Sequence, residues 1–417
     1  MKKTGIVAGA VLAALVLIGV GYSHQQQQRG AEVAQVAAGY FQAARNDGAP
    51  QSQAGALSTS AVSAVFVEDS TGVDDGVQRL ARAMQTHGAG FHQTAAEPSG
   101  LIAANAIVLL KINAQWDQRG GTNTDLIRGV IQEVLNHPDG FSGEIIVADN
   151  GQGIGRLDWV QNNAENRGQS AMSVIRAFQA QGHRVTGVLW DNFTNIRVQE
   201  FSEGDMADGF VVESAIRPTG LEISYPKFTT EFGTQVSFRH GVWNEATRTY
   251  NSDMLKVINM PVLKAHYMTQ VTAAVKNFMG VPSNALTGRR PHNSVLTGGM
   301  GTLMAQTRMP VLNIIDMIWI APDRGPWVSY DAAVRANKIA ASTDPFALDY
   351  WTTRHVLMPE AARFPGRRAV AMDPAGAEPG TFGHWMRLSM DEVRTAGIAV
   401  TMNPAEMLIV QNGIARQ

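Results

Sequence analysis

Residues 106–150 contain three segments that together indicate the fold class: AIVLLKIN (106–113), TDLIRGVIQEVL (124–135) and GEIIVADN (143–150). The first and third segments are continuous apolar runs, which are typical of strands buried on both faces. The middle segment has apolar residues at helical spacing. A buried strand, a helix and a second buried strand predict two parallel strands joined by a crossover helix.

The same alternation extends in both directions along the chain. Strands are predicted at 61–69, 184–192, 256–263, 309–316 and 338–343, and helices at 74–85, 170–182, 268–280 and 344–357, with an irregular, antiparallel or loop-rich section at about 195–250. We therefore predict an α/β fold with a mainly parallel sheet and helices on both faces, built as one large domain or as two closely joined lobes.

The N-terminus predicts export. Lys2 and Lys3 precede an apolar run of about 18 residues, 5–22, which indicates a signal peptide or a signal anchor. No small-residue cleavage motif follows directly, and the run is just long enough to span a bilayer as an apolar helix. Both readings stay open, and both place the body outside the cytoplasm, in the periplasm or another extracytoplasmic space. A signal anchor would also tether it to the inner membrane. The expected parts are the signal (1–22), a polar linker (23–60), the main α/β domain (61–357) and a C-terminal extension packing on it (358–417).

Composition excludes several classes of protein. The chain of 417 residues has a net charge of −2 and no block of like charges, so nucleic-acid binding is not indicated. It has no cysteine, which excludes disulfides, a thiol nucleophile and cysteine-ligated iron–sulfur or zinc sites. Oligomeric state does not follow from composition.

Polar residues follow most of the predicted strands. In an open parallel sheet, ligands bind outside the carboxyl ends of the strands, where such residues gather at one edge. Lysine at the end of an apolar strand is the less ordinary feature, because turns favour Gly, Asn, Asp and Ser. The residues are Lys111 and Asn113, Asp149 and Asn150, Asp191 and Asn192, Lys264 and His266, Asp316, and Asp344.

The densest group of such residues lies in 259–280. Lys264 and His266 are two residues apart, so they share one face of an extended strand. Thr269, Thr272 and Lys276 share one face of the predicted helix. Free N–H groups at a helix N-terminus favour anions, so we predict a cradle for a carboxylate or phosphate. The alternative is a solvated helix face with a buried, capped histidine.

Three weaker signals are open to two readings. GQGIG (151–155) follows a strand, but its spacing differs from that of a dinucleotide-binding loop. RRPHNS (289–294), which includes His292, either closes over an anionic ligand or is ordinary surface. Asp316, Asp344 and Asp349 could bind a divalent metal, although Asp344 before Pro345 is also a helix cap.

Several motifs together resemble the family known as domain of unknown function 362. They are VLLKIN (108–113), INMPVLKAHYMTQVTAAVKNFMG (258–280), the His292 loop, LNIID (312–316) and ASTDPFALD (341–349). The resemblance covers roughly residues 61–357 and implies an α/β domain whose activity is not established for most members. Many relatives carry cysteine-rich iron–sulfur segments, which this chain lacks. By similarity, the positions to watch are Lys111, Asn113, Lys264, His266, Thr272, Lys276, Asn277, Asp316, Asp344 and Asp349.

These observations predict one polar site and leave two functions open. The first is an extracytoplasmic enzyme acting on a small anionic substrate, and the second is a membrane-tethered binding or sensing module without turnover. In the enzyme, His266 and Lys264 would be catalytic, with histidine as acid or base. The ligand-binding residues would be Lys111, Asn113, Thr272, Lys276, Asn277 and His292.

Overall fold

The computed structural model describes residues 63–416, except 161–163, 166, 324 and 365–368. The predicted signal or anchor (1–22) and linker (23–60) therefore lie outside the described residues and stay predictions. In the described part of the chain, no helix combines the length and the apolar character needed to cross a membrane.

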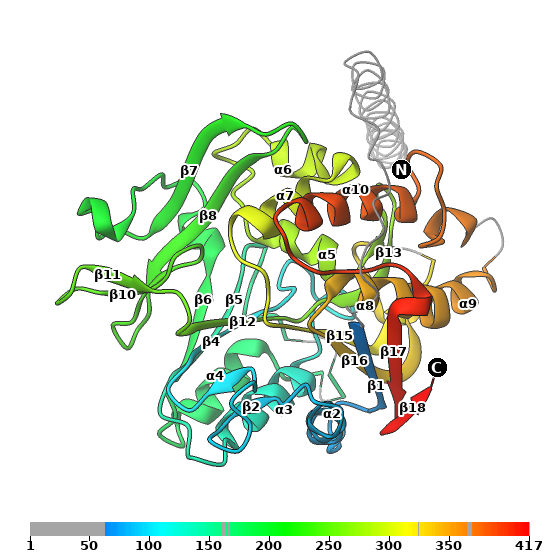
Figure 1. The fold of residues 1–417 in the computed structure, drawn as a ribbon, viewed down its shortest axis with the longest axis horizontal. Coiled ribbons are helices and arrows are strands. Elements are labelled where there is room, and N and C mark those ends of the chain that lie inside the picture. The colour runs from blue at the N-terminus through cyan, green and yellow to red at the C-terminus, as the bar shows by residue number, and fades with distance from the viewer. Residues whose placement is uncertain (1–62, 161–163, 166, 324, 365–368, 417) are drawn as a thin grey trace, which may run out of the picture. The chain divides into compact units, whose positions relative to one another are not determined.

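A large sheet forms the centre of the structure (Figure 1). Its strands pair in parallel except where β16 lies between β15 and β1, and where β18 and β14 turn back on their neighbours. Across the sheet the order is β18 (Ile414–Arg416), β17 (Met407–Gln411), β1 (Ser63–Asp69), β16 (Val334–Ser342), β15 (Leu312–Ala321), β12 (Leu255–Asn259), β4 (Ile107–Lys111), β5 (Glu144–Asp149) and β6 (Val185–Leu189). Two further strands lie off this path: β13 (Val262–His266) pairs with β15, and β14 (Gln270–Thr272) pairs with β13.

The antiparallel strand β16 has a simple cause. The connection between β15 and β16, residues 322–333, contains no α-helix in its described part. A parallel return would need a crossover long enough to pass over the sheet, whereas antiparallel neighbours can be joined directly.

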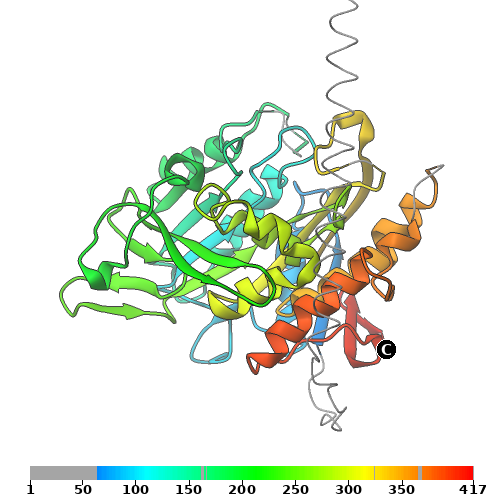
Figure 2. The ribbon, with the colours of Figure 1, turned by 90° about the horizontal axis from the view of Figure 1, so that it is seen from above.

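Helices and a second sheet cover the two faces of the large sheet (Figure 1). One face carries α2 (Gly76–Thr86), α3 (Thr124–Leu135) and α4 (Ala171–Gln179). The other carries α5 (Ala274–Asn277), α7 (Gly299–Gln306), α8 (Pro345–Thr352) and α10 (Phe382–Thr395), and α7 and α10 lie side by side in the view from above (Figure 2). The expected α/β architecture with helices on both faces is confirmed.

The second sheet lies in the section predicted to be irregular or antiparallel. It is wholly antiparallel and packs its apolar side into the same core as α5 and α7. Its strands are β11 (Thr249–Asn251), β10 (Gly241–Asn244), β9 (Gln235–Ser237), β8 (Glu222–Thr229) and β7 (Gly209–Ile216); the remaining short elements are β2 (His92–Gln93), β3 (Ile102–Ala103), α6 (Arg290–Asn293) and α9 (Met358–Ala361).

Strand β4 shows why the apolar run at 107–110 determines the centre of the sheet. Ile107 and Leu109 enter one apolar core, and Val108 and Leu110 enter the other. Such alternation buries both faces of the strand, so its backbone must pair on both sides, with β12 and β5. The described residues from 63 to 416 belong to one compact unit, which agrees with the reading of the body as one large domain.

Candidate functional site: a cation-lined cavity at the sheet edge

A cavity of about 310 Å³ lies where β4, β5 and β13 end. In the register of the sheet, Lys111 of β4 is opposite Asn259 of β12 and Ala148 of β5, so these strands finish together. All eight residues predicted to be catalytic or ligand-binding line this one space. The lining residues are Lys111, Asn113, Gln115, Trp116, Asp149, Asn150, Gln152, Lys264, His266, Tyr267, Thr272, Lys276, Asn277, Met279, Gly280, Arg289, His292 and Pro326.

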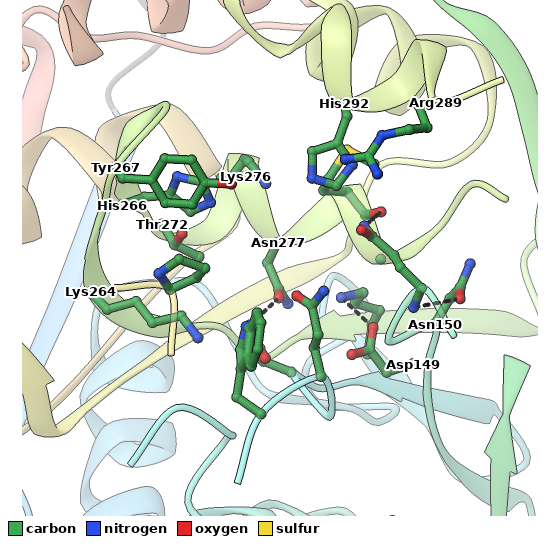
Figure 3. A pocket seen from close by; sticks show the side chains of 18 residues that line it. Asp149, Asn150, Lys264, His266, Tyr267, Thr272, Lys276, Asn277, Arg289 and His292 are labelled. Carbon is green, nitrogen blue, oxygen red and sulfur yellow. Dashed lines mark hydrogen bonds and ion pairs between the residues drawn. The ribbon is translucent and has the colours of Figure 1, made fainter. Parts of the chain in front are cut away.

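Residues far apart in the chain enter the cavity from different sides (Figure 3). Lys264, His266 and Thr272 come from the β13–β14 hairpin, Lys276 from α5, and Arg289 and His292 from α6 and its start. Lys111 is the last residue of β4, and Asp149 is the last residue of the neighbouring strand β5. The predicted convergence of lysines and histidines is therefore present.

Burial weakens the charge of the cavity lysines. The pKa of Lys264 falls to about 7, first because of burial and then because Lys276 is close. Burial and the charge of Lys111 lower the pKa of Lys276 to about 7 as well. Burial, Lys276 and Arg289 lower the pKa of His292 to about 3, so this ring is neutral at pH 7. Near pH 7, each of the two lysines can exist with or without its proton.

Lys111 and Asp149 form a buried ion pair. Their Nζ and Oδ1 atoms are 2.7 Å apart, and both side chains are almost fully buried. Burial lowers the pKa of Lys111 and raises the pKa of Asp149, and the charge of each partner opposes that shift. Asp149 Oδ2 also accepts from Ala114 N at 2.7 Å. Gly280 packs so closely here that a Cβ atom would overlap both charged groups.

Several buried polar atoms of the cavity have no hydrogen-bond partner among the described residues. They are Asn113 Oδ1, Trp116 Nε1 and Thr272 Oγ1. The ammonium group of Lys276 is also buried, and no hydrogen bond or ion pair joins it to the described part of the chain. Lys264 Nζ, by contrast, donates to Gly120 O at 2.6 Å. Buried polar groups are normally paired, so these atoms indicate a place for a bound molecule or ordered water.

The hydrogen bonds of His266 determine where its proton lies. Its Nδ1 accepts from Met268 N at 3.1 Å and from Thr269 N at 3.3 Å. A backbone N–H can only donate, so Nδ1 is the unprotonated nitrogen and the neutral ring carries its proton on Nε2. The ring stacks on Tyr267, with centroids 5.0 Å apart. The neutral His266 is thus a donor through Nε2.

The helix predicted at 268–280 is wrong in its first half. Residues 270–272 form β14, which pairs antiparallel with β13 and sets Thr272 opposite Lys264. Only Ala274–Asn277 is α-helical, followed by a 3₁₀ turn to Gly280. The shared helix face of Thr269, Thr272 and Lys276 therefore does not exist. Thr272 and Lys276 reach one cavity because a hairpin and a short helix meet there.

Asp349 lies at the N-terminus of α5, so N–H groups at this helix start bind a side chain of the protein itself. Its carboxylate accepts from Ala274 N at 2.6 Å and Val275 N at 2.9 Å. Burial raises the pKa of Asp349 to about 8, although these two hydrogen bonds oppose the shift. Asp349 therefore holds the segment that carries Lys276 and Asn277, without touching the cavity.

The three aspartates proposed for a metal do not line the cavity. Asp316 accepts from Asn123 N and Ile318 N. Asp344 caps α8, as its position before Pro345 suggested, by accepting from Phe346 N. Over the described ranges, no group of three or more His, Asp or Glu side chains is arranged to hold a metal ion. The geometry thus gives the proposed metal site no support.

The loops GQGIG (151–155) and RRPHNS (289–294) differ in what their polar groups contact. In GQGIG, the N–H groups of Gly151 and Gly153 donate to Asp191, so this loop wraps around a carboxylate of its own chain. RRPHNS is partly helical, and Arg289 and His292 line the cavity. Its proposed role over an anion keeps geometric support.

Some lining residues had little or no signal in the sequence. Asp149 was recognised only as one of several polar strand ends, because nothing local shows that Lys111 is its partner. Trp116 lies in an irregular loop and Tyr267 in a turn, where their contacts depend on distant segments. The hydrogen-bonded positions of Asn259 and Asn313 behind the cavity could have been suspected, since asparagine inside apolar strands is uncommon.

Fold and cavity together define an α/β protein with a small, donor-rich, cationic pocket at its sheet edge. Residues 246–354 match the model of a family described as Domain of unknown function (DUF362). The expected resemblance is confirmed over this segment, which supplies Lys264, His266, Thr272, Lys276, Asn277 and His292 to the cavity, while Lys111, Asn113 and Asp149 precede it. No curated protein and no solved structure matches the chain.

Replacing Asp349 with leucine is expected to destabilise the fold by about 2–5 kcal/mol, because two buried N–H groups lose their acceptor. Asp349→Asn keeps one acceptor and should cost less. In the unfolded chain Asp349 ionises near its ordinary pKa of 3.8, whereas in the fold it keeps its proton to about pH 8. Wild-type stability should therefore fall between about pH 4 and 8 relative to Asp349→Asn. Urea denaturation at both pH values measures this, and a constant difference between the two proteins would contradict it.

Proposed function

We propose that the cavity binds a small carboxylate or phosphate and that the protein is an enzyme acting on it outside the cytoplasm. The observation that carries the proposal is the Lys276 ammonium group, buried and without a partner in the described part of the chain. A buried cation without a counter-charge is unfavourable, and an anionic ligand would supply that charge.

The remaining lining groups support an anion rather than a cation. Lys264 and Arg289 add positive charge, whereas Asp149, the acidic residue lining the cavity, forms a neutral pair with Lys111. Trp116 Nε1 and Thr272 Oγ1 have no hydrogen-bond partner among residues that the structure describes, and both can donate to ligand oxygens. A volume of about 310 Å³ suits a small molecule.

The lowered lysine pKa values support proton transfer in this site. An amine with a pKa near 7 can give or take a proton at neutral pH, which is the requirement for general acid–base catalysis. Lys264 and Lys276 both meet this requirement. His266 contributes as a donor through Nε2, because its Nδ1 is occupied by backbone N–H groups.

A binding or sensing module without turnover is the second candidate. One observation favours it: the Thr272 hydroxyl makes no hydrogen bond to any described residue, so no base in that part of the chain activates it as a nucleophile. Under this alternative the same cations capture the anion and release it unchanged.

A ligand panel separates the candidates. Titration calorimetry of wild-type protein with small carboxylates and phosphates at pH 7 should show saturable binding. The affinity should fall as salt is added, because salt screens the attraction between the anion and the cationic site. NMR of the incubated ligand should then show a product for an enzyme and an unchanged spectrum for a binding module. Absence of binding by every anion would refute both. Export stays a prediction, which fractionation of cells expressing the full chain would check.

A further inference from the structure

Four buried asparagines form a continuous hydrogen-bonded chain that ends in the cavity. Asn313 Nδ2 donates to Ser342 O at 3.2 Å, and Asn259 Nδ2 donates to Asn313 Oδ1 at 2.9 Å. Asn277 Nδ2 donates to Asn259 Oδ1 at 2.8 Å, and Asn113 Nδ2 donates to Asn277 Oδ1 at 3.5 Å. The chain runs from the middle of the large sheet, at β16, to the cavity wall.

The direction of every amide in this chain is determined at its buried end. Ser342 O is a backbone carbonyl and can only accept, so Asn313 must turn its NH₂ group toward it. Asn259 also donates to Ala274 O at 2.9 Å, which fixes its orientation independently. Each asparagine then offers its carbonyl oxygen to the next one. Asn113, the last member, must present Oδ1 to the cavity, and this atom is buried without a partner in the described ranges.

Asn113 Oδ1 differs in kind from the groups around it. Lys276 Nζ, Trp116 Nε1 and His266 Nε2 are donors, and so is the neutral His292 ring through the nitrogen that does not contact Asn284. Asp149 is also an acceptor, but it is held by Lys111. A simple anion can accept hydrogen bonds from these donors, but it has no donor for Asn113 Oδ1. This oxygen would then stay unpaired or lie against another acceptor oxygen. Either outcome is unfavourable in a buried site.

We propose that the ligand carries an O–H or N–H donor close to its anionic group, and that Asn113 selects for this donor. The substrate class is therefore a small carboxylate or phosphate bearing a hydroxyl or amino group. This inference rests on the proposed function, since it describes the ligand of the same cavity. Asn277, Asn259 and Asn313 are positioning residues, because they orient Asn113 without facing the ligand through their own carbonyl groups.

Matched ligand pairs test the inference. Calorimetry at pH 7 would compare lactate with propionate, alanine with propionate, and glycerol 1-phosphate with propyl phosphate. For at least one pair, wild-type protein should bind the donor-bearing member about 10- to 100-fold more tightly, which is the usual effect of leaving a buried acceptor unpaired. Equal affinity within every pair would overturn the inference and leave anion binding intact. Absence of binding by every anion would refute the proposed function itself, and this inference with it.

Two substitutions test the role of Asn113. Asn113→Leu removes the acceptor at similar size and should bring both members of a pair to equal affinity. Asn113→Asp keeps an acceptor but loses the Nδ2 donor to Asn277 Oδ1, so it tests the effect of charge: both affinities should fall because of the added negative charge. Thermal melts check that both variants fold. A preference that persists in a folded Asn113→Leu would show that another group selects the donor.

Discussion

Lys111→Met is expected to destabilise the fold by about 3–5 kcal/mol, because it leaves the Asp149 carboxylate buried without its counter-charge. The two groups are 2.7 Å apart and almost fully buried, so bulk solvent screens the remaining charge only weakly. Asp149→Asn should also destabilise, although by less, since a buried lysine can lose its proton. Urea denaturation at pH 7 would measure both effects.

The double variant is the decisive control for this ion pair. Lys111→Met combined with Asp149→Asn removes both charges, and the new asparagine can still accept from Ala114 N. Its stability should return to within about 1–2 kcal/mol of wild type, because a buried ion pair contributes little over neutral groups of similar size. Additive losses from the two single changes would show that the residues act independently.

Lys276→Met is expected to raise stability and to weaken anion binding at the same time. The unfolded lysine keeps its proton up to its ordinary pKa of 10.5, whereas the folded one loses it near pH 7. The fold therefore bears the full cost of the buried charge below about pH 7, and that cost disappears as pH rises toward 10.5. Methionine removes it, so the variant should be more stable at pH 6 by on the order of 3 kcal/mol, with a smaller difference at pH 10.

Binding should move in the opposite direction in the same variant. Loss of one charge-assisted hydrogen bond should weaken the tightest anion of the panel by about 10- to 100-fold. Lys256→Met is a matched control, because Lys256 lies at the other end of β12 from the cavity. It should change neither binding nor the pH dependence of stability. Unchanged anion affinity in Lys276→Met would remove the main support for the proposed function.

The pKa of Lys264 should also change in the Lys276→Met variant. Lys276 is the second cause, after burial, of the lowered pKa of Lys264. Removing its charge should let the pKa of Lys264 rise toward its ordinary value. If the protein is an enzyme that uses Lys264 for proton transfer, its pH–rate profile should then shift to higher pH in Lys276→Met.

Most of the α/β architecture and of the cavity lining followed from local patterns. The apolar run of β4 required burial on both faces, and strand ends in a parallel sheet meet at one edge, so Lys111, Asn113 and Lys264 could be placed together. The antiparallel β16 and the hairpin at 262–272 were missed. In both cases the residues are compatible with more than one local structure, and pairing with a neighbouring strand decides between them.

The side chains available to the site can be read from the sequence: lysines and asparagines at the ends of apolar strands, no cysteine, and an N-terminal apolar run. How each side chain is used depends on the folded arrangement. In the fold, Lys111 forms an ion pair with Asp149, and Asp349 accepts hydrogen bonds from the first N–H groups of α5. The hydrogen bonds of the asparagine chain orient Asn113 so that its Oδ1 faces the cavity. The physical reason is that local patterns depend on neighbours in the chain. Charge and hydrogen-bond direction in a buried site depend on groups that only folding brings within about 3 Å.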